Sequence, residues 1–348
     1  MEPWTRGPTI GRGSSATVSI ATAHGSDEIF AVKSAELSKS EFLQTEQQIL
    51  STLSSPSIIA YKGCSVSSEK GNLVYNLCME YAPGGTLSDE VHRRGGWLKE
   101  AEIRSYTRQI LIGLEYLHSH GIVHCDIKGH NVLVAGEGVV KIADLGCARR
   151  VDHEVSNADR KRPIAGTPVY MAPEVARGEE QGFAADLWAL GCTVIEMATG
   201  KAPWADGSDP VSVLYQIGFL NGAPKIPCFM SKQAKDFLSK CLKRDPLERW
   251  SASELLSHGF IDESELFTEE SGTCKMGSPT SVLDNGLWEW DTADEEELEK
   301  NPNPNPTHER STSTFSALER IRRLSEGSTV TWSMRMDGWD LDEDWVTG

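Results

Sequence analysis

The strongest constraint in the sequence is a run of polar residues enclosed by short apolar segments. The residues His124–Asn131 include an aspartate, a lysine and an asparagine, and they lead directly into the apolar run Val132–Val134. A second apolar pair, Val139–Val140, leads in turn toward Asp144. Short runs of β-branched residues predict strands. The polar groups are therefore expected at the ends of strands. Their order and spacing would rarely occur by chance, so they indicate a functional site.

These polar residues meet the requirements of phosphoryl transfer. That reaction needs a base that orients the attacking hydroxyl, metal ligands, and cations near the transferred group. Asp126 can accept the hydroxyl proton, and Lys128 can stabilise the phosphoryl oxygens. Asn131 and Asp144 offer oxygen atoms, the ligands that Mg²⁺ prefers. We predict catalytic roles for Asp126, Lys128 and Asn131, and metal-binding roles for Asn131 and Asp144.

A glycine-rich segment near the N-terminus predicts a turn between two strands. Glycine lets backbone N–H groups approach phosphate oxygens without a side-chain clash. Ala16 stands where a third glycine would complete the pattern, and it is still small. Taken alone, the segment indicates an ordinary hairpin turn, and no βαβ unit surrounds it as in a dinucleotide-binding fold. The candidate phosphate-binding positions are Ile10, Gly11, Arg12, Gly13, Ser14, Ser15, Ala16 and Val18.

A lysine and a glutamate lie in unusual places in the next segment. Lys33 ends the apolar strand Phe30–Lys33. The pattern Ser38–Glu41 predicts a capping box that starts a helix, and Glu46 interrupts the apolar stripe of that helix. Each residue alone fits a solvent-facing position, but an ion pair between Lys33 and Glu46 would explain both. In that pair Lys33 would reach the phosphates of ATP, and we predict a catalytic role for it. The stripe consists of Phe42, Ile49, Leu50 and Leu53.

A second amphipathic helix is predicted over residues 101–120. Gly121 is a plausible end of this helix, which delivers the chain into the polar run at His124. The apolar face consists of Ile103, Tyr106, Ile110, Leu114 and Leu117.

Three zones divide the chain. Residues 1–79 read as short strands around one helix, and residues 85–261 read mainly as helices. Residues 262–348 carry most of the net charge of −17 and contain the repeat Asn301–Pro306, which favours an extended linker. We expect this acidic, tryptophan-containing tail to be largely disordered and regulatory. Its charge argues against nucleic-acid and membrane binding.

Composition also indicates the compartment. The eight cysteines include no C-x-x-C pair, which favours a reduced intracellular setting over a disulfide framework or a zinc module. The sequence contains neither a signal-peptide pattern at its start nor an apolar run long enough to span a membrane. We therefore expect the cytoplasm, the nucleus or both.

One further motif, Gly166–Glu174, completes a resemblance to eukaryotic protein kinases, which extends over about residues 4–261. The resemblance implies a bilobal α+β fold. The kinase domain is expected at residues 1–261, and the tail at 262–348. The domain would consist of an antiparallel-sheet N-lobe with one regulatory helix (1–79), a hinge (80–84) and a mainly helical C-lobe (85–261). ATP and Mg²⁺, with Mn²⁺ as an alternative, are the implied cofactors. The further nucleotide-binding positions that it implies are Ala31, Lys33, Glu46, the gatekeeper Met79, Glu80 and Ala82.

The resemblance also assigns class and structural roles. Lys128 follows the serine/threonine pattern, and Thr167 can hydrogen-bond near Asp126 and Lys128. Arg249 is expected to pair with Glu174, and Asp186 to brace the catalytic-loop backbone. The segments Met79–Leu87 and Gly166–Glu174 resemble MAP kinase kinase kinases of the MEKK group, most of all the short plant members.

That group implies protein substrates, namely MAP kinase kinases, and a place in stress or hormone signalling. Upstream kinases or docking proteins are expected at the tail. Three alternatives stay open. A serine/threonine kinase outside the cascade is rejected only weakly. A pseudokinase scaffold would lack residues such as Lys33 or Asp126, and a small-molecule kinase would lack the segment Gly166–Glu174.

Two residues depart from the kinase pattern. Leu145 replaces phenylalanine after Asp144, and we expect its apolar packing to be retained near Leu50 and His124. Cys125 replaces an arginine that pairs with an activation-segment phosphate in many kinases, and cysteine offers no charged fork. We hypothesise that phosphorylation, for example at Ser156, cannot act through this contact. The other candidate phosphosites are Thr167, Ser278 and Ser325.

Overall fold

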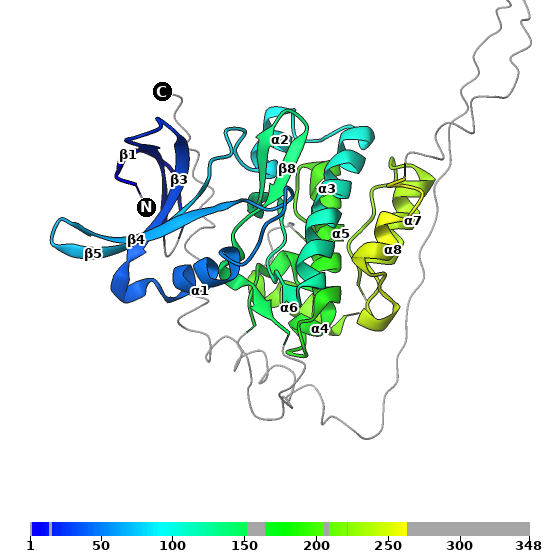
Figure 1. Cartoon of the computed structure of the whole chain (residues 1–348). Coiled ribbons are helices and arrows are strands. Elements are labelled where there is room, and N and C mark those ends of the chain that lie inside the picture. Colours follow the sequence, from blue (N-terminus) through cyan, green and yellow to red (C-terminus); the bar gives the residue numbers. More distant parts are fainter. Residues whose placement is uncertain (1, 14–15, 152–163, 205–208, 221, 263–348) are drawn as a thin grey trace, which may run out of the picture.

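The computed structural model describes residues 2–13, 16–151, 164–204, 209–220 and 222–262. An antiparallel sheet with one helix forms the N-terminal part, and helices form most of the remainder (Figure 1). The sheet has the strand order β1-β2-β3-β5-β4. Its strands are β1 (Trp4–Arg12), β2 (Thr17–Ala23), β3 (Ile29–Glu36), β4 (Tyr61–Glu69) and β5 (Asn72–Glu80).

The alternation of side chains along β3 decides which of them face the helix α1 (Glu41–Leu50). Phe30 and Val32 belong to a small apolar cluster on one face of the sheet. Ala31 and Ala35 belong to the main core on the other face. Lys33 lies between these two alanines in the strand, so it points toward α1.

Helix α1 starts differently from the prediction. Residues Leu37–Lys39 form a 3₁₀ turn, and the Ser40 side chain donates to the Leu37 carbonyl at 2.8 Å. The expected capping box therefore does not form. Phe42 was expected in the apolar stripe, but it is 43% exposed, because the turn rotates Leu43 toward the core instead.

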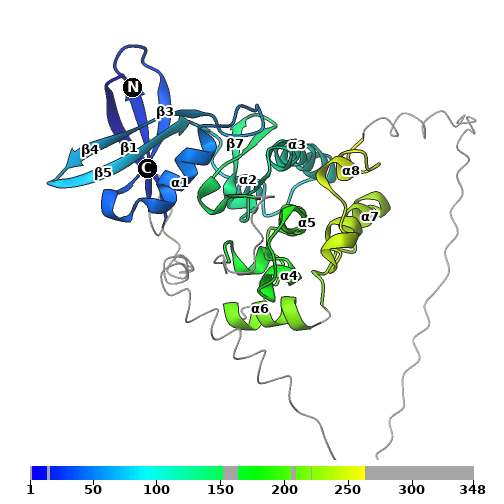
Figure 2. The ribbon, with the colours of Figure 1, turned by 60° about the horizontal axis from the view of Figure 1, so that its bottom comes forward.

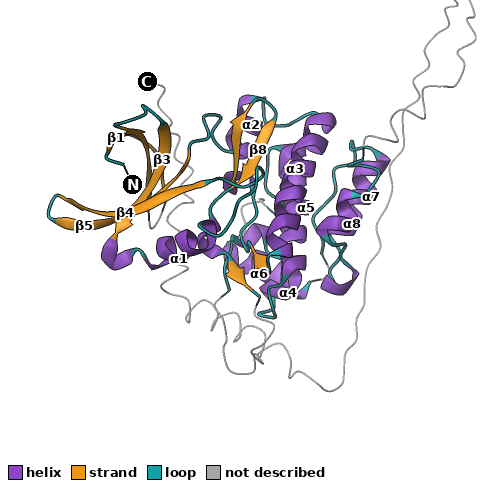
Figure 3. Cartoon of the chain, in the orientation of Figure 1, coloured by secondary structure: helices purple, strands orange, loops and turns teal. Residues whose placement is uncertain are grey.

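The C-terminal part is built around two long helices, α3 (Glu100–Ser119) and α5 (Phe183–Thr199) (Figure 3). Helix α5 is predominantly apolar and buried almost throughout. The predicted apolar face of α3 is buried, and Gly121 follows the helix with φ +69°, a left-handed conformation that glycine adopts readily. The other helices are α2 (Leu87–Arg93), α4 (Pro173–Ala176), α6 (Pro210–Phe219), α7 (Lys232–Cys241) and α8 (Ala252–Leu256).

Two short antiparallel pairs of strands flank the polar run His124–Asn131, near the junction of the N-terminal and C-terminal parts (Figure 2). They are β6 (Ile122–Val123) with β9 (Arg149–Arg150), and β7 (Val132–Gly136) with β8 (Val139–Ile142). The chain after α1 is tied to β8, because Ile142 donates to Ser57 and accepts from Ile59, each at 2.9 Å. The helix that carries Glu46 is thereby anchored beside Asp144.

The described residues confirm the expected fold class, an antiparallel-sheet N-lobe and a mainly helical C-lobe. Strand β5 continues to Glu80, which was expected to begin the hinge, since Glu80 still pairs with Phe30 in β3. The expected tail lies outside the described residues, apart from Asp262. Across the described ranges, no helix has both the length and the apolar character needed to span a membrane.

A buried ion pair ties α4 to the chain before α8. Arg249 donates to both carboxylate oxygens of Glu174, at 2.8 and 3.1 Å, and their side chains are 0% and 3% exposed. Arg249 also donates to the carbonyls of Ala184 and Lys243. The five donors of the guanidinium group are well used, which buried charges require.

Arg249→Met should destabilise the protein strongly, because it leaves the Glu174 carboxylate buried without its cation. The expected cost is about 3–5 kcal/mol, equivalent to a melting temperature lower by roughly 10 °C. Circular dichroism melts of the two proteins check this. The matched control, Arg249→Met with Glu174→Met, should recover part of the loss, since it removes the stranded charge. A single variant that melts within about 2 °C of wild type would contradict the prediction.

Candidate active site

The loop between β6 and β7 is held in place by hydrogen bonds to one carboxylate of α5. Asp186 accepts from the backbone N–H groups of His124 and Cys125, each at 2.9 Å, and it also contacts His118 at 2.9 Å. Cys125 has φ +69°, an uncommon conformation for a residue with a side chain. Two directed hydrogen bonds on neighbouring N–H groups hold this strained turn in place, as the resemblance implied for Asp186.

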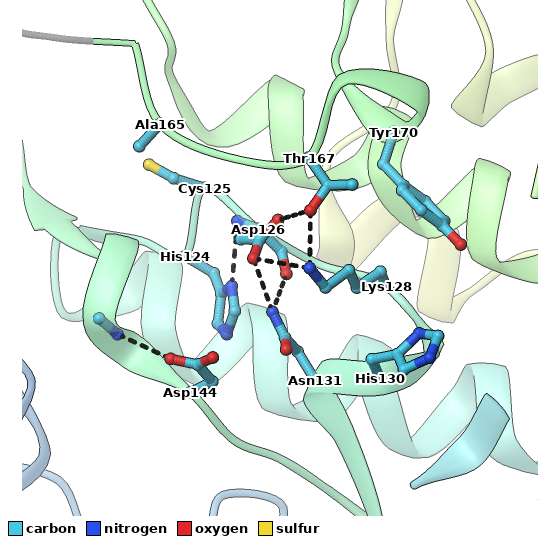
Figure 4. A network of polar contacts seen from close by, with 12 residues as sticks. His124, Cys125, Asp126, Lys128, His130, Asn131, Asp144, Ala165, Thr167 and Tyr170 are labelled. Carbon is cyan, nitrogen blue, oxygen red and sulfur yellow. Dashed lines mark hydrogen bonds and ion pairs between the residues drawn. The ribbon is translucent and has the colours of Figure 1, made fainter. Parts of the chain in front are cut away.

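His124 connects this loop to the strand that leads to Asp144. Its Nε2 donates to the Ala143 carbonyl at 3.0 Å, because a carbonyl can only accept. Its Nδ1 accepts from the Asp126 N–H at 3.2 Å (Figure 4). Both contacts are satisfied by a neutral imidazole that carries its proton on Nε2. The ring therefore sets the distance between the loop of Asp126 and the loop of Asp144.

The Asp126 carboxylate lies at the centre of a polar cluster (Figure 4). Thr167 donates to one carboxylate oxygen at 2.7 Å, and Asn131 donates to the other at 2.9 Å. Lys128 lies 3.2 Å from that second oxygen and donates to the Thr167 hydroxyl at 2.7 Å. The structure thus brings together Asp126, Lys128, Asn131 and Thr167, and it confirms the predicted contacts of Thr167.

Lys33 makes the second cluster, together with Glu46 and Asp144. Its ammonium group lies 2.8 Å from Glu46 and 3.0 Å from Asp144. Glu46 is buried, so the alternative of a solvent-facing glutamate is wrong and the predicted pairing is confirmed. Burial by itself would lower the pKa of Lys33, but Asp144 and Glu46 outweigh it and raise that pKa. Burial raises the pKa of Glu46, and Lys33 opposes the rise.

Asn131 and Asp144 fit the requirements for a divalent metal. Asn131 turns its amide nitrogen toward two oxygens of Asp126, at 2.7 and 2.9 Å, so its amide oxygen is directed elsewhere. Asp144 is a carboxylate with a side chain 37% exposed, and it begins a 3₁₀ turn with φ +58°. Two hard oxygen ligands of this kind would suit Mg²⁺.

The expected phosphate-binding turn joins β1 and β2. Gly11 and Arg12 pair with Val18 and Thr17 across the two strands, and the Gly13 N–H donates to the Ala16 carbonyl at 2.8 Å. Ile10 and Arg12 are exposed there. Ser14 and Ser15 lie outside the described residues.

The expected nucleotide pocket continues along β3 and β5, where Ala31 and Met79 are opposite each other and buried. The Glu80 N–H donates to the Ala60 carbonyl, at 2.9 Å, so this N–H is not available to a ligand. The Glu80 carboxylate pairs with Lys141 at 2.6 Å. The Ala82 carbonyl accepts a long bond from Gly85 at 3.4 Å.

The two departures from the kinase pattern behave differently. Leu145 is buried in the main core together with Leu50, which confirms that its apolar packing is retained. The Cys125 thiol is also buried, and burial, aided by Asp186, raises its pKa. Ser156, Ser278 and Ser325 lie outside the described residues, so the hypothesis about Cys125 and phosphorylation stays a prediction.

Sequence reasoning missed one polar cluster below the catalytic loop. The buried carboxylate of Glu196 accepts from Ser88 at 2.6 Å, Gly129 N–H at 3.2 Å and Tyr170 at 2.9 Å. It thereby joins α2, the catalytic loop and the segment before α4. The signal was available, because Glu196 interrupts an apolar stretch of α5 in the same way that Glu46 interrupts α1.

Comparison with known proteins agrees with this geometry. The model of the protein kinase domain matches residues 4–261. Mitogen-activated protein kinase kinase kinase 18 of Arabidopsis thaliana is 51% identical, over 99% of this chain and 98% of its own length. Kinase kinase kinase 17 of the same plant is 52% identical, over 82% of this chain and 77% of its own. Kinase kinase kinase 20 is 40% identical, over 95% and 97%.

Lys33→Met should make stability depend on pH, because it removes the cation that opposes the rise in the Glu46 pKa. A carboxyl whose pKa is higher in the folded chain stabilises the fold when it is protonated, so stability falls as pH rises above its ordinary value of 4.5. We expect the variant to lose roughly 5 °C of melting temperature relative to wild type between about pH 5 and pH 8.

The control for this experiment is Lys33→Met combined with Glu46→Gln. Its melting temperature should change less with pH than that of the single variant across the same range, since the titrating group is gone. Parallel curves for the single variant would show that Glu46 does not titrate there, and the prediction would be wrong.

Proposed function

Since this chain belongs to the protein kinase family, as a serine/threonine kinase related to plant MAP kinase kinase kinases, we propose that its substrates are MAP kinase kinases. The substrate class rests on the similarity to these relatives, and one observation carries the phosphoryl-transfer part of the proposal. The Asp126 carboxylate is held by Lys128, Asn131 and Thr167 at the junction of the two lobes, where a substrate hydroxyl can meet a nucleotide.

The residues of this cluster divide the work of the reaction. ATP supplies the phosphoryl group, and a divalent metal neutralises the charge of its phosphates. In our proposal, Asp126 orients the substrate hydroxyl and accepts its proton. Lys128 stabilises negative charge that develops beside Asp126, and Thr167 holds both side chains in register. Positioning and electrostatic stabilisation are the main contributions that a protein makes to this reaction.

The second cluster prepares the nucleotide site. Glu46 keeps Lys33 fixed on β3, and Asp144 shares that cation from the other lobe. We propose that Lys33 turns to the phosphates of ATP, and that Asp144 and Asn131 bind Mg²⁺, with Mn²⁺ as the alternative. Removal of metal with EDTA followed by addition of each ion tests the choice. Activity that is restored by Mn²⁺ but not by Mg²⁺ would show that Mn²⁺ is the metal used instead.

The cellular setting extends this proposal. Two relatives named as MAP kinase kinase kinases align with this chain over nearly their whole length, which supports a place for this protein at the top of a MAP kinase cascade. We propose that the protein serves stress or hormone signalling. We place the protein in the cytoplasm, the nucleus or both, on the basis of its scattered cysteines. The acidic tail is proposed as the docking site for upstream kinases or partners.

The substrate class can be tested directly. The full chain is incubated with Mg²⁺-ATP and with catalytically inactive MAP kinase kinases, and phosphosites are mapped by mass spectrometry. Phosphorylation of serine or threonine in their activation segments is expected. Equal or better phosphorylation of unrelated proteins would instead favour a serine/threonine kinase outside the cascade.

Asp126→Asn should reduce kcat by about 10²–10⁴-fold, because asparagine cannot accept the hydroxyl proton. Affinity for ATP should change little, since Lys33, Glu46 and Asp144 are untouched. Initial rates with radiolabelled ATP measure both quantities. The control is Glu180→Gln, the same chemical change at an exposed position, and it should be as active as wild type. A wild-type protein as inert as Asp126→Asn would indicate a scaffold without catalysis.

A further inference from the structure

We propose that Gln181 is a positioning residue for phosphoryl transfer, which clamps the segment carrying Thr167 onto the loop carrying Asp126 through neutral hydrogen bonds. Gln181 lies between α4 and α5, and it is 6% exposed. Nothing in its surrounding sequence marks it as special.

The side-chain amide of Gln181 bridges the two segments. Its Nε2 donates to the carbonyl of Cys125 at 3.2 Å and to the carbonyl of Ala165 at 3.0 Å. Cys125 directly precedes Asp126, and Ala165 lies two residues before Thr167 (Figure 4). One amide nitrogen has two hydrogens, so both bonds can form at once.

The orientation of the amide follows from its surroundings. Two carbonyl oxygens face the end of the side chain, and a carbonyl can only accept, so the nitrogen must point toward them. The Oε1 atom has no hydrogen-bond partner among the described residues, and Gln181 lines a small cavity together with Asp126, Thr167 and Asp186. A buried polar atom without a partner is costly, so the two bonds that the nitrogen donates offset a penalty at the oxygen.

The backbone around these bonds is tightly fitted. Gly166 has φ +119°, and a Cβ placed on it would lie 2.5 Å from the Cys125 carbonyl oxygen. The two segments therefore touch at the carbonyl that Gln181 holds. The backbone of Gln181 is fixed in its turn, because Arg149 on β9 donates to its carbonyl.

These contacts explain how Thr167 reaches Asp126 without a charged residue at position 125. Asp186 holds the N–H side of the Cys125 peptide region, at 2.9 Å, and Gln181 holds its carbonyl side. With residues 125 and 165 fixed to the same amide, Thr167 is placed 2.7 Å from both Asp126 and Lys128. Among the described residues, the side-chain hydrogen bonds of Gln181 reach only Cys125 and Ala165, neither of which is proposed for ATP or metal. The residue should therefore affect kcat rather than the KM for ATP.

The test compares Gln181→Met and Gln181→Glu with wild type in the full chain, with casein as a general substrate. Gln181→Met keeps the length of the side chain but loses both donated bonds. We expect kcat to fall roughly tenfold, the equivalent of one or two neutral hydrogen bonds, with the KM for ATP unchanged. Thr167→Ala should lower kcat as well, and adding Gln181→Met to it should cause no further loss.

Gln181→Glu supplies a readout that a purely structural residue would not give. An ionised carboxylate at position 181 would only accept, so it could not bond to the two carbonyl oxygens that it faces. A protonated carboxyl group could donate one hydrogen bond to them. Asp126 and Asp186 around the same cavity disfavour ionisation, and Arg149 favours it. The kcat of this variant relative to wild type should therefore rise as pH falls from about 8 to about 6, while the ratio for Gln181→Met stays constant. Gln233→Glu, on the exposed face of α7, is the control and should match wild type.

Several results would overturn the proposal. They are an unchanged kcat in Gln181→Met, additive losses with Thr167→Ala, or a loss of kcat that only follows the unfolded fraction in thermal melts. If Gln181→Met does not fold, the pH ratio of Gln181→Glu decides, and a ratio independent of pH rejects the clamp.

Discussion

The buried carboxylate of Asp186 is the interaction on which the catalytic centre depends. It accepts two backbone N–H groups from the turn at His124 and Cys125, and that turn contains a residue with positive φ. A conformation of this kind persists only where surrounding contacts compensate for its cost. Because Asp186 belongs to α5, a helix of the C-lobe that is buried along most of its length, the position of Asp126 is fixed relative to the core rather than to surface loops.

A second interaction, centred on Lys33, joins the two lobes. Its cation is shared between Glu46 of α1 and Asp144 of the loop after β8, at 2.8 and 3.0 Å. An ion pair that is largely removed from water is a weak source of net stability but demands an accurate geometry. The position of α1 is therefore coupled to the metal-binding loop, and the coupling is electrostatic as well as apolar through Leu145.

The backbone of the turn at residues 124–126 is paired with one carboxylate and two neutral side chains. Asp186, His124 and Gln181 contact the backbone of residues 124–126 from three directions, and Cys125 contributes only a buried thiol. Backbone carbonyls and N–H groups at this junction must be paired, because the loop is closed off from water. The neutral amide of Gln181 pairs with the Cys125 carbonyl, so this side of the turn is held without a charged group.

The sequence by itself determined the parts that are local or fixed in spacing: the strands around the polar run, the apolar face of α3, and the set Lys33, Asp126, Lys128, Asn131 and Asp144. Even the pairing of Lys33 with Glu46 could be predicted, since a charge on an apolar stripe needs a partner. Only the tertiary structure decided the rest. It placed Leu43 rather than Phe42 inward, because a 3₁₀ turn rotates α1, and it brought Gln181 to carbonyls 56 and 16 residues away. Such bonds to backbone atoms leave no pattern of residue types, so they become visible only when the chain is folded.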